Sequence, residues 1–142
     1  MPVRHKALVL DANILIRAVL GPRVRELILA NADKVQFFVP AVCVADARKY
    51  LPELLANRKI DPAPAMALLE GILGHVQLLE DEWLADAEQV ARERMRGRDE
   101  ADWPVLAAAL VLDCPVWTQD ADFFGVGVTT WSTSHIECFF KR

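Results

Sequence analysis

The sequence predicts an α/β protein, a three-layer α/β/α sandwich around a central, mainly parallel sheet of four to five strands. Short apolar runs that suit buried strands alternate along the chain with longer segments of helical periodicity. Such alternation is typical of βαβ units, in which helices cover both faces of a parallel sheet. With 142 residues, of which 54% are hydrophobic and 25% charged, the chain is large enough to bury one core. We therefore expect residues 1–142 to form a single domain.

The first part of the chain is expected to contain two strands and three helices. The strands are expected at 7–10 and 35–39, and the helices at about 14–20, 24–32 and 41–55. The Gly21-Pro22 pair separates the first two helices, and Pro40 ends the second strand. Pro52 predicts a kink or break in the third helix, because proline lacks the N–H group that the helical hydrogen bonds need.

The remainder of the chain is expected to contain three helices and three strands. The helices are expected from Asp61 to about Leu73, at 83–95 and at 102–112, and the strands at 76–79, 115–118 and 127–131. Helix 83–95 is amphipathic, with an apolar face formed by Leu84, Ala87, Val90, Ala91 and Met95. The apolar C-terminal segment HIECFFKR suits packing on the sheet, a dimer contact or a partner segment, and the sequence does not choose among them.

Composition restricts the class of protein. The three cysteines are odd in number and widely spaced, which is typical of reduced thiols in a cytoplasmic protein. Every apolar run is shorter than the roughly 20 residues that cross a bilayer, so we expect no membrane association. The net charge of −4 argues against broad electrostatic attraction to nucleic acid. A role on nucleic acid would therefore need local basic groups or metal ions.

Aspartates follow the expected strands at the edge where parallel sheets form their sites. The candidates are Asp11, Asp46, Asp99, Asp102, Asp120 and Asp122. Each has an ordinary explanation as well. Asp11 and Asp102 suit helix N-caps, Asp120 and Asp122 suit turns, and Asp99 suits a solvated loop. Asp46 is the hardest to explain in this way, because it lies within the otherwise apolar stretch AVCVADA.

Together these acids predict a site for a divalent cation. Two carboxylates about 5 Å apart repel each other by on the order of 3 kcal/mol at an effective dielectric constant near 20. Carboxylate ligands select hard ions such as Mg²⁺ or Mn²⁺, which suit phosphodiester cleavage. A zinc site is not expected, since there is no CxxC or HExxH motif and the three histidines stand apart. Asn13 and Thr118 lie beside the expected site and are candidates to orient acids, waters or phosphate.

The segments VLDANIL, VPAVCVAD and RDEADWPVLAAALVLDCPVWTQDADF resemble the PIN-domain family of small metal-dependent ribonucleases, which includes the VapC-type toxins of toxin–antitoxin pairs. The resemblance covers nearly the whole chain. It implies that Asp11, Asp46, Asp102 and Asp120 are catalytic, and that Asp11, Asp102, Asp120, Asp99 and Asp122 bind the metal. One departure is Asp46, because the second acid of the family is usually glutamate.

The resemblance also implies an activity and partners. It implies a Mg²⁺- or Mn²⁺-dependent endoribonuclease acting on RNA, a homodimer and a co-encoded antitoxin that blocks the site. The Asp46 departure leaves open a catalytically silent PIN-like module that binds RNA or protein. Arg92, Arg96 and Arg98 immediately precede Asp99 and are candidate substrate ligands, with a solvated helix end as the alternative explanation.

Overall fold

The computed structural model describes residues 6–142, whose strands form one parallel sheet in the order β3-β2-β1-β4-β5. The strands are β1 (Lys6–Leu10), β2 (Val35–Pro40), β3 (Val76–Leu79), β4 (Val116–Trp117) and β5 (Thr130–Trp131). The sheet is therefore parallel throughout the described residues, as the alternation of strands and helices predicts. The last two strands are shorter than the runs expected at 115–118 and 127–131.

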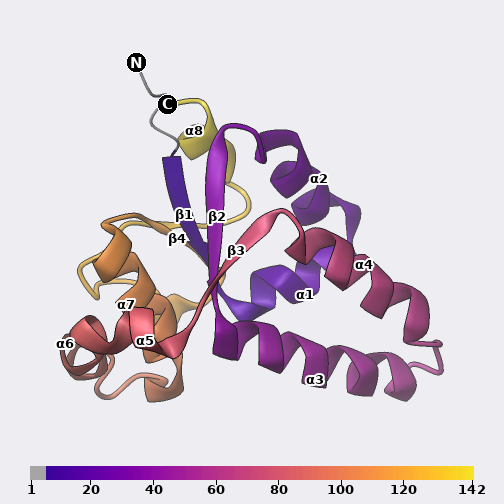
Figure 1. Cartoon of the computed structure of the whole chain (residues 1–142), viewed down its shortest axis with the longest axis horizontal. Helices are drawn as coiled ribbons and strands as arrows, with labels where there is room; N and C mark the ends of the chain where they lie inside the picture. The colour runs from indigo at the N-terminus through magenta and orange to yellow at the C-terminus, as the bar shows by residue number, and fades with distance from the viewer. Residues whose placement is uncertain (1–5) are drawn as a thin grey trace.

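Helices cover both faces of this sheet, which confirms the predicted α/β/α sandwich. The α-helices are α1 (Ala12–Leu20), α2 (Pro22–Asn31), α3 (Ala41–Asn57), α4 (Ala63–Leu73), α5 (Asp81–Leu84), α6 (Glu88–Arg94), α7 (Trp103–Leu112) and α8 (Ile136–Phe140). Short 3₁₀ turns are η1 (Ala85–Ala87), η2 (Glu100–Asp102) and η3 (Ala121–Phe123). Figure 1 shows α1 to α4 on one side of the strands and α5 to α7 on the other.

The core lies between β1, its neighbours and α7. Leu8, Val9 and Leu10 of β1 are fully buried, because this strand is central and has helices on both faces. Helix α7 packs against β1 and β2 and buries the run 104–109. Its alanines allow the helix to lie close to the sheet. The absence of a polar face on this helix, readable in WPVLAAALVL, is typical of a helix buried all round.

Two helices differ from the sequence expectation. The helix predicted at 83–95 is divided into α5, η1 and α6, and both α5 and α6 contact α7. Leu84 and Ala91 are buried in this arrangement, whereas Val90 from the predicted apolar face is 44% exposed. Packing around α7 therefore overrides the periodicity of the segment. In contrast, α3 continues through Pro52 without a break, since the buried side chains of Leu51 and Leu55 hold it on either side.

The C-terminal segment packs on the sheet, which answers the question left open by HIECFFKR. The Phe140 ring meets the rings of Trp117 and Phe37 edge-on, with centroid distances of 6.0 and 6.2 Å. Lys6 Nζ donates hydrogen bonds to the carbonyl oxygens of Phe139 and Phe140, at 2.6 and 3.3 Å. These contacts join the start of β1 to the end of the chain. None of the helices formed by residues 6–142 has the length and apolar character needed to span a membrane.

Candidate functional site

Asp11 connects β1 to α1 and is the most buried acid of the site. Its side chain is an N-cap: Asp11 Oδ1 accepts a hydrogen bond from the Ile14 N–H at 2.9 Å. Asp11 Oδ2 accepts a second hydrogen bond from Thr118 Oγ1 at 2.5 Å. The residue is only 6% exposed, yet it lines an open cavity at the carboxyl edge of the sheet. Capping explains how Asp11 is held, and the cavity gives its carboxylate access to a ligand.

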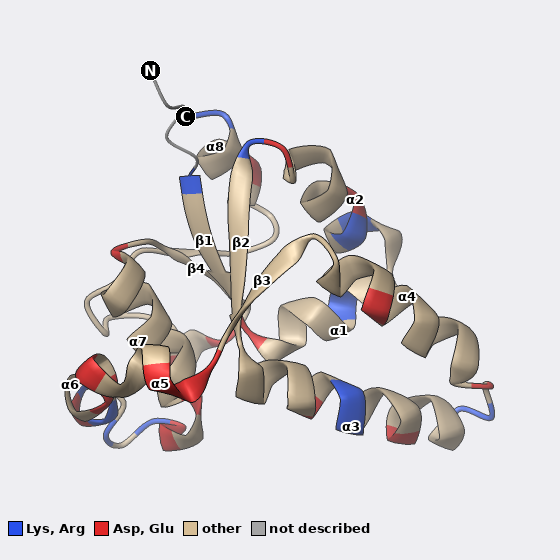
Figure 2. Ribbon diagram, in the orientation of Figure 1, with Lys and Arg blue, Asp and Glu red and all other residues tan. Residues whose placement is uncertain are grey.

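Five aspartates from separate segments line this one cavity, which has a volume of about 300 Å³. They are Asp11, Asp46, Asp99, Asp102 and Asp120. Asp46 comes from α3, Asp99 precedes η2 and Asp102 ends it, and Asp120 follows β4. No lysine or arginine is among the residues that line the cavity. Figure 2 shows acidic segments gathered around the carboxyl ends of the strands. We name this feature the acidic cavity.

Thr118 and Asp122 position the acids through hydrogen bonds. The Thr118 hydroxyl donates to Asp11 and accepts a hydrogen bond from the Asp120 N–H at 2.9 Å. Asp120 Oδ1 in turn accepts from the Asp122 N–H at 2.9 Å. Asp122 Oδ2 accepts from the Asp99 N–H at 3.2 Å and is not among the residues lining the cavity. The structure thus gives Asp122 a contact that positions the Asp99 segment, whereas Asn13 lies on the cavity wall itself.

Burial and mutual repulsion raise the pKa values of two of these acids, Asp102 and Asp11. The pKa of Asp102 is raised to about 7 by burial first, then by Asp99 and by the neighbouring carboxyl group of Asp120. Burial also raises the pKa of Asp11, although the hydrogen bonds from Thr118 and Ile14 oppose that effect. Asp102 therefore binds a proton far more readily than an ordinary aspartate when no cation is bound. The same environment raises the pKa of the buried Cys43 thiol, which consequently stays protonated.

The donor set of the acidic cavity fits a hard divalent cation. Its charged ligands are all carboxylates, and no basic side chain on its wall neutralises them. Within the part of the chain that the structure describes, no three Asp, Glu, His or Cys side chains are placed to hold an ion as they stand. Both Asp11 oxygens are already engaged, in hydrogen bonds with Ile14 and Thr118. Binding would therefore use bridging waters, which Mg²⁺ retains readily, or a rotation of side chains.

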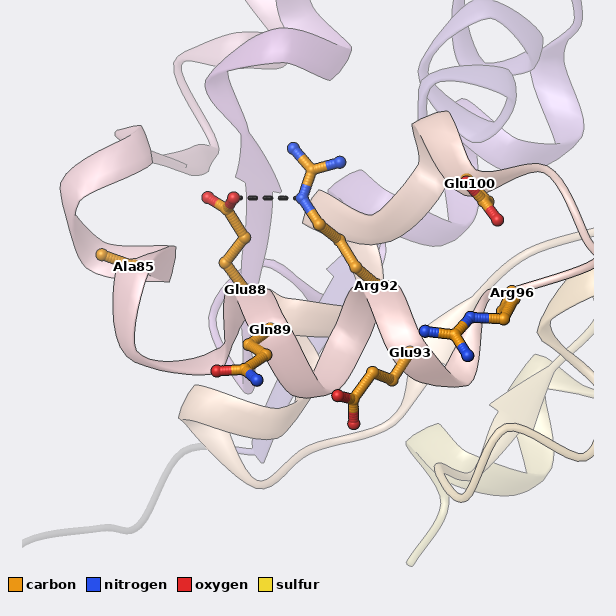
Figure 3. Close-up of a pocket in the computed structure, with 7 residues that line it drawn as sticks. All are labelled: Ala85, Glu88, Gln89, Arg92, Glu93, Arg96 and Glu100. Carbon is orange, nitrogen blue, oxygen red and sulfur yellow. Dashed lines mark hydrogen bonds and ion pairs between the residues drawn. The ribbon is translucent and has the colours of Figure 1, made fainter.

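Two of the arginines suggested as substrate ligands make contacts within the domain. Arg92 forms an ion pair with Glu88 at 3.0 Å, and its guanidinium lies 4.7 Å from the centroid of the Trp103 ring. Arg98 Nη1 donates to the carbonyl oxygens of Asp122 and Phe124. Arg96 lies on a separate cavity beside α6, where Figure 3 shows it with Glu88, Glu93 and Glu100. A substrate role for these arginines stays a prediction.

Arg98 and Arg94 hold the loop that follows Asp120, a role that the sequence did not indicate. Arg94 Nη1 donates to the carbonyl oxygen of Val126 at 3.2 Å. Gly127 has φ +91°, a conformation that favours glycine, and a Cβ there would lie 2.7 Å from Arg94 Nη1, so the arginine side chain would have to shift. The signals in the sequence were Gly125 and Gly127 after TQDADFF, but the partner helix was not deducible from them.

Replacing Arg98 with alanine should therefore loosen the Asp120 loop. We expect a loss of about 1–2 kcal/mol in the free energy of unfolding, because two carbonyl groups lose a charged donor. Urea unfolding measures this change, with Arg58→Ala as the control, since Arg58 is an exposed arginine at the far end of α3. Unchanged stability with weaker RNA binding would instead assign Arg98 to the substrate.

Comparison with known proteins identifies the family. A family model for the PIN domain matches residues 9–141. The chain belongs to the PIN-domain family. The match covers nearly the whole sequence, so the resemblance found in VLDANIL and the two longer segments is confirmed. A search of curated proteins found no match.

Solved structures share the fold of this PIN domain. A chain of the DNA-bound VapBC structure from Salmonella typhimurium matches with a TM-score of 0.70 and 18% identity, covering 92% of this chain and 99% of that one. For FitAcB from Neisseria gonorrhoeae the TM-score is 0.69 and the identity 25%, with 90% and 99% covered. For VapBC2 from Rickettsia felis, bound to a promoter DNA fragment, the values are 0.68 and 12%, with 89% and 98% covered. These structures therefore share the PIN-domain fold of this chain.

Proposed function

We propose that this PIN domain is a metal-dependent endoribonuclease that hydrolyses RNA phosphodiester bonds, and that it is the toxin of a type II toxin–antitoxin pair. One observation carries the proposal: five carboxylates from separate segments line a single cavity that contains no neutralising lysine or arginine on its wall. Such a cavity repels a phosphate unless a cation binds first. A divalent cation bound there would offset the negative charge of the acids, so that a phosphate of the substrate could enter the same cavity.

The residues in and around the acidic cavity have distinct proposed tasks. Asp11, Asp102 and Asp120 would hold Mg²⁺ or Mn²⁺, with Asp99 and Asp122 as auxiliary acids and Asp46 as the fourth catalytic acid. When bound, the ion would lower the pKa of a coordinated water and stabilise charge on the leaving oxygen. Thr118 keeps the Asp11 carboxylate oriented through its hydroxyl hydrogen bond. Asn13, exposed on the cavity wall, supplies an uncharged side chain that can hydrogen-bond a phosphate oxygen or a water.

Support for the partners comes from the structures with the same fold. These include VapBC and FitAB structures and a toxin–antitoxin complex from Klebsiella pneumoniae. By analogy, a cognate antitoxin protein is the proposed partner, and a homodimer is the proposed assembly of a cytoplasmic protein. The largest exposed apolar side chains, Trp83 and Phe124, are 64% and 53% exposed and lie on the α5 to α7 side and in the Asp120 loop.

The test of the function is cleavage of single-stranded RNA by the purified protein. We expect cleavage with Mg²⁺ or Mn²⁺, and loss of cleavage on addition of EDTA. Expression without the partner is expected to arrest growth. The catalytically silent module, favoured only by Asp46 in place of the usual glutamate, predicts intact RNA in every condition. Intact RNA, together with no effect of Mn²⁺ on thermal stability, would contradict the nuclease proposal.

A further inference from the structure

A second cavity continues from the acidic cavity along one face of α1. Its volume is about 650 Å³, and its wall includes Asn13, Ile16, Arg17, Leu20, Pro22 and Arg23. Asn13 and Ile16 line both cavities, so the two spaces adjoin each other. The helical periodicity places Asn13, Ile16, Arg17 and Leu20 on one side of α1, while Ile14, Leu15, Ala18 and Val19 face the core. We name this second cavity the Arg17 groove.

The Arg17 groove is basic where the acidic cavity is acidic. It is lined by Arg17 and Arg23 and by no aspartate or glutamate. Arg23 forms an ion pair with Glu137 of α8. Arg17 is exposed, and among residues 6–142 its guanidinium makes no hydrogen bond or ion pair. Arg17 directly follows Ile16, which lines both cavities, so its charge lies beside the acidic cavity. An unpaired guanidinium thus lies beside the carboxylates without neutralising the cavity wall.

The cavity beside α6 offers a contrast, because it holds the arginines that the sequence suggested. Its wall carries Arg92 and Arg96 but also Glu88, Glu93 and Glu100, so acids outnumber bases there. Figure 3 shows the Glu88 carboxylate paired with Arg92. The cavity beside α6 shares no lining residue with the acidic cavity. A phosphate would meet more repulsion than attraction on this surface.

We propose that the Arg17 groove binds the nucleotide of a single-stranded RNA that adjoins the cleaved phosphodiester bond, an inference that rests on the proposed ribonuclease function. Arg17 contacts the phosphate, because guanidinium presents paired donors that match two phosphate oxygens. Ile16, Leu20 and Pro22 supply an apolar wall for the ribose and base. The volume of the groove lies within the range of about 300–1,000 Å³ that is usual for ligand sites. Asn13 lines both cavities, so it would lie between the phosphate on Arg17 and the phosphate that is cleaved.

A nucleic acid fits the pair of cavities better than a peptide does. A polynucleotide has a phosphate at every nucleotide. A single strand can therefore present one phosphate to Arg17 and a second phosphate to the cation expected in the acidic cavity. An acidic peptide would satisfy Arg17 but would bring its carboxylates towards those of Asp11 and Asp120. The charge pattern along the two cavities therefore favours a strand of RNA.

The test compares RNA binding by matched arginine variants. All variants carry Asp120→Asn, which lowers repulsion in the acidic cavity and, by abolishing cleavage, keeps a short fluorescein-labelled single-stranded RNA intact. They are measured with Mg²⁺, so that the acidic cavity can accept a phosphate. Arg17→Ala should raise the dissociation constant about tenfold. It should also reduce the slope of log K against log salt by about 0.7, the value for one lost phosphate contact on a single strand. The dissociation constant of Arg17→Lys should lie between those of Arg17→Ala and the protein that retains Arg17.

Arg58→Ala is the matched control, because it removes the same charge from an exposed helix end remote from both cavities. Fluorescence anisotropy should show no change for this control. Arg17→Ala is not expected to affect folding, since an exposed position of α1 accepts alanine well. Circular dichroism of each variant verifies this.

Other outcomes overturn the inference in distinguishable ways. Equal binding by Arg17→Ala and Arg58→Ala would remove the phosphate contact, even if the wild-type protein cleaves RNA. A larger loss with Arg96→Ala would move the strand to the cavity beside α6. Normal RNA binding by Arg17→Ala with lost binding of a protein inhibitor would assign the groove to that partner. If Arg17→Ala weakens RNA binding but the wild-type protein never cleaves RNA with Mg²⁺, the groove stands and the nuclease function fails.

Discussion

Replacing Asp120 with asparagine should abolish RNA cleavage and leave the fold intact. We expect a loss of about 1,000-fold or more, because the change removes a carboxylate from the set proposed to hold the ion. The fold should persist, since the amide oxygen of asparagine can still accept the hydrogen bond from the Asp122 N–H. Asp11→Asn should have a similar effect on cleavage. Its amide can accept from the Ile14 N–H and donate to the Thr118 hydroxyl, so the α1 cap should survive.

Initial rates on a labelled RNA, with thermal unfolding of each variant, measure both halves of this prediction. Asp113→Asn is the matched control. Asp113 is exposed at the end of α7, has φ 50°, and lies outside the acidic cavity. Asparagine tolerates this left-handed conformation as well as aspartate does. Full cleavage by Asp120→Asn or by Asp11→Asn would remove that residue from the mechanism.

The convergence of the acids was predictable because it depends on topology. Asp11 and Asp120 follow strands, and in a parallel sheet the carboxyl ends of neighbouring strands meet at one edge. The observed order places β1 beside β4, which brings these two acids together through Thr118. Asp46 was identifiable because an acid in the apolar stretch AVCVADA is hard to explain as a cap or turn residue, and the structure places it on the cavity wall.

Features that depend on side-chain packing were not predictable. The break between α5 and α6 reflects how both pack on α7, which no periodicity in 83–95 encodes. Arg98 stays a candidate substrate ligand because it precedes Asp99, but the sequence did not indicate that it also donates to carbonyl groups in a loop that is distant in sequence. The Arg17 groove was not predictable from the sequence for a similar reason. Its wall combines one face of α1 with Pro22, Arg23 and Thr133, which only the folded chain brings together.

Without a divalent cation, the domain should lose stability as the pH rises from about 4 to about 7. The pKa of Asp102 is about 7 in the folded domain and near its ordinary value of 3.8 in the unfolded chain. Between these values the folded state binds more protons, so raising the pH favours unfolding. Because Asp102 is only about half-buried, solvent screening reduces the full linkage effect, and we expect a decrease on the order of 2 kcal/mol in the free energy of unfolding. Asp11 adds to it in the same direction, since burial raises its pKa too.

Urea unfolding in EDTA at a series of pH values measures this decrease, with Asp102→Asn as the informative variant. The amide that replaces the carboxyl group cannot ionise. The stability of that variant should therefore depend less on pH and should exceed the wild-type stability at pH 7. The control Asp113→Asn should show the same pH dependence as the wild type. Adding Mg²⁺ at neutral pH should restore the wild type by about 2.7 kcal/mol at 100 times the dissociation constant and affect Asp102→Asn much less. A wild-type profile as flat as that of Asp102→Asn would show that neither burial nor the neighbouring carboxylates raise the pKa of Asp102. With repulsion present, the aspartate that lowers the stability of the metal-free domain is also the one that makes cation binding favourable, so the same substitution should stabilise the fold and abolish cleavage.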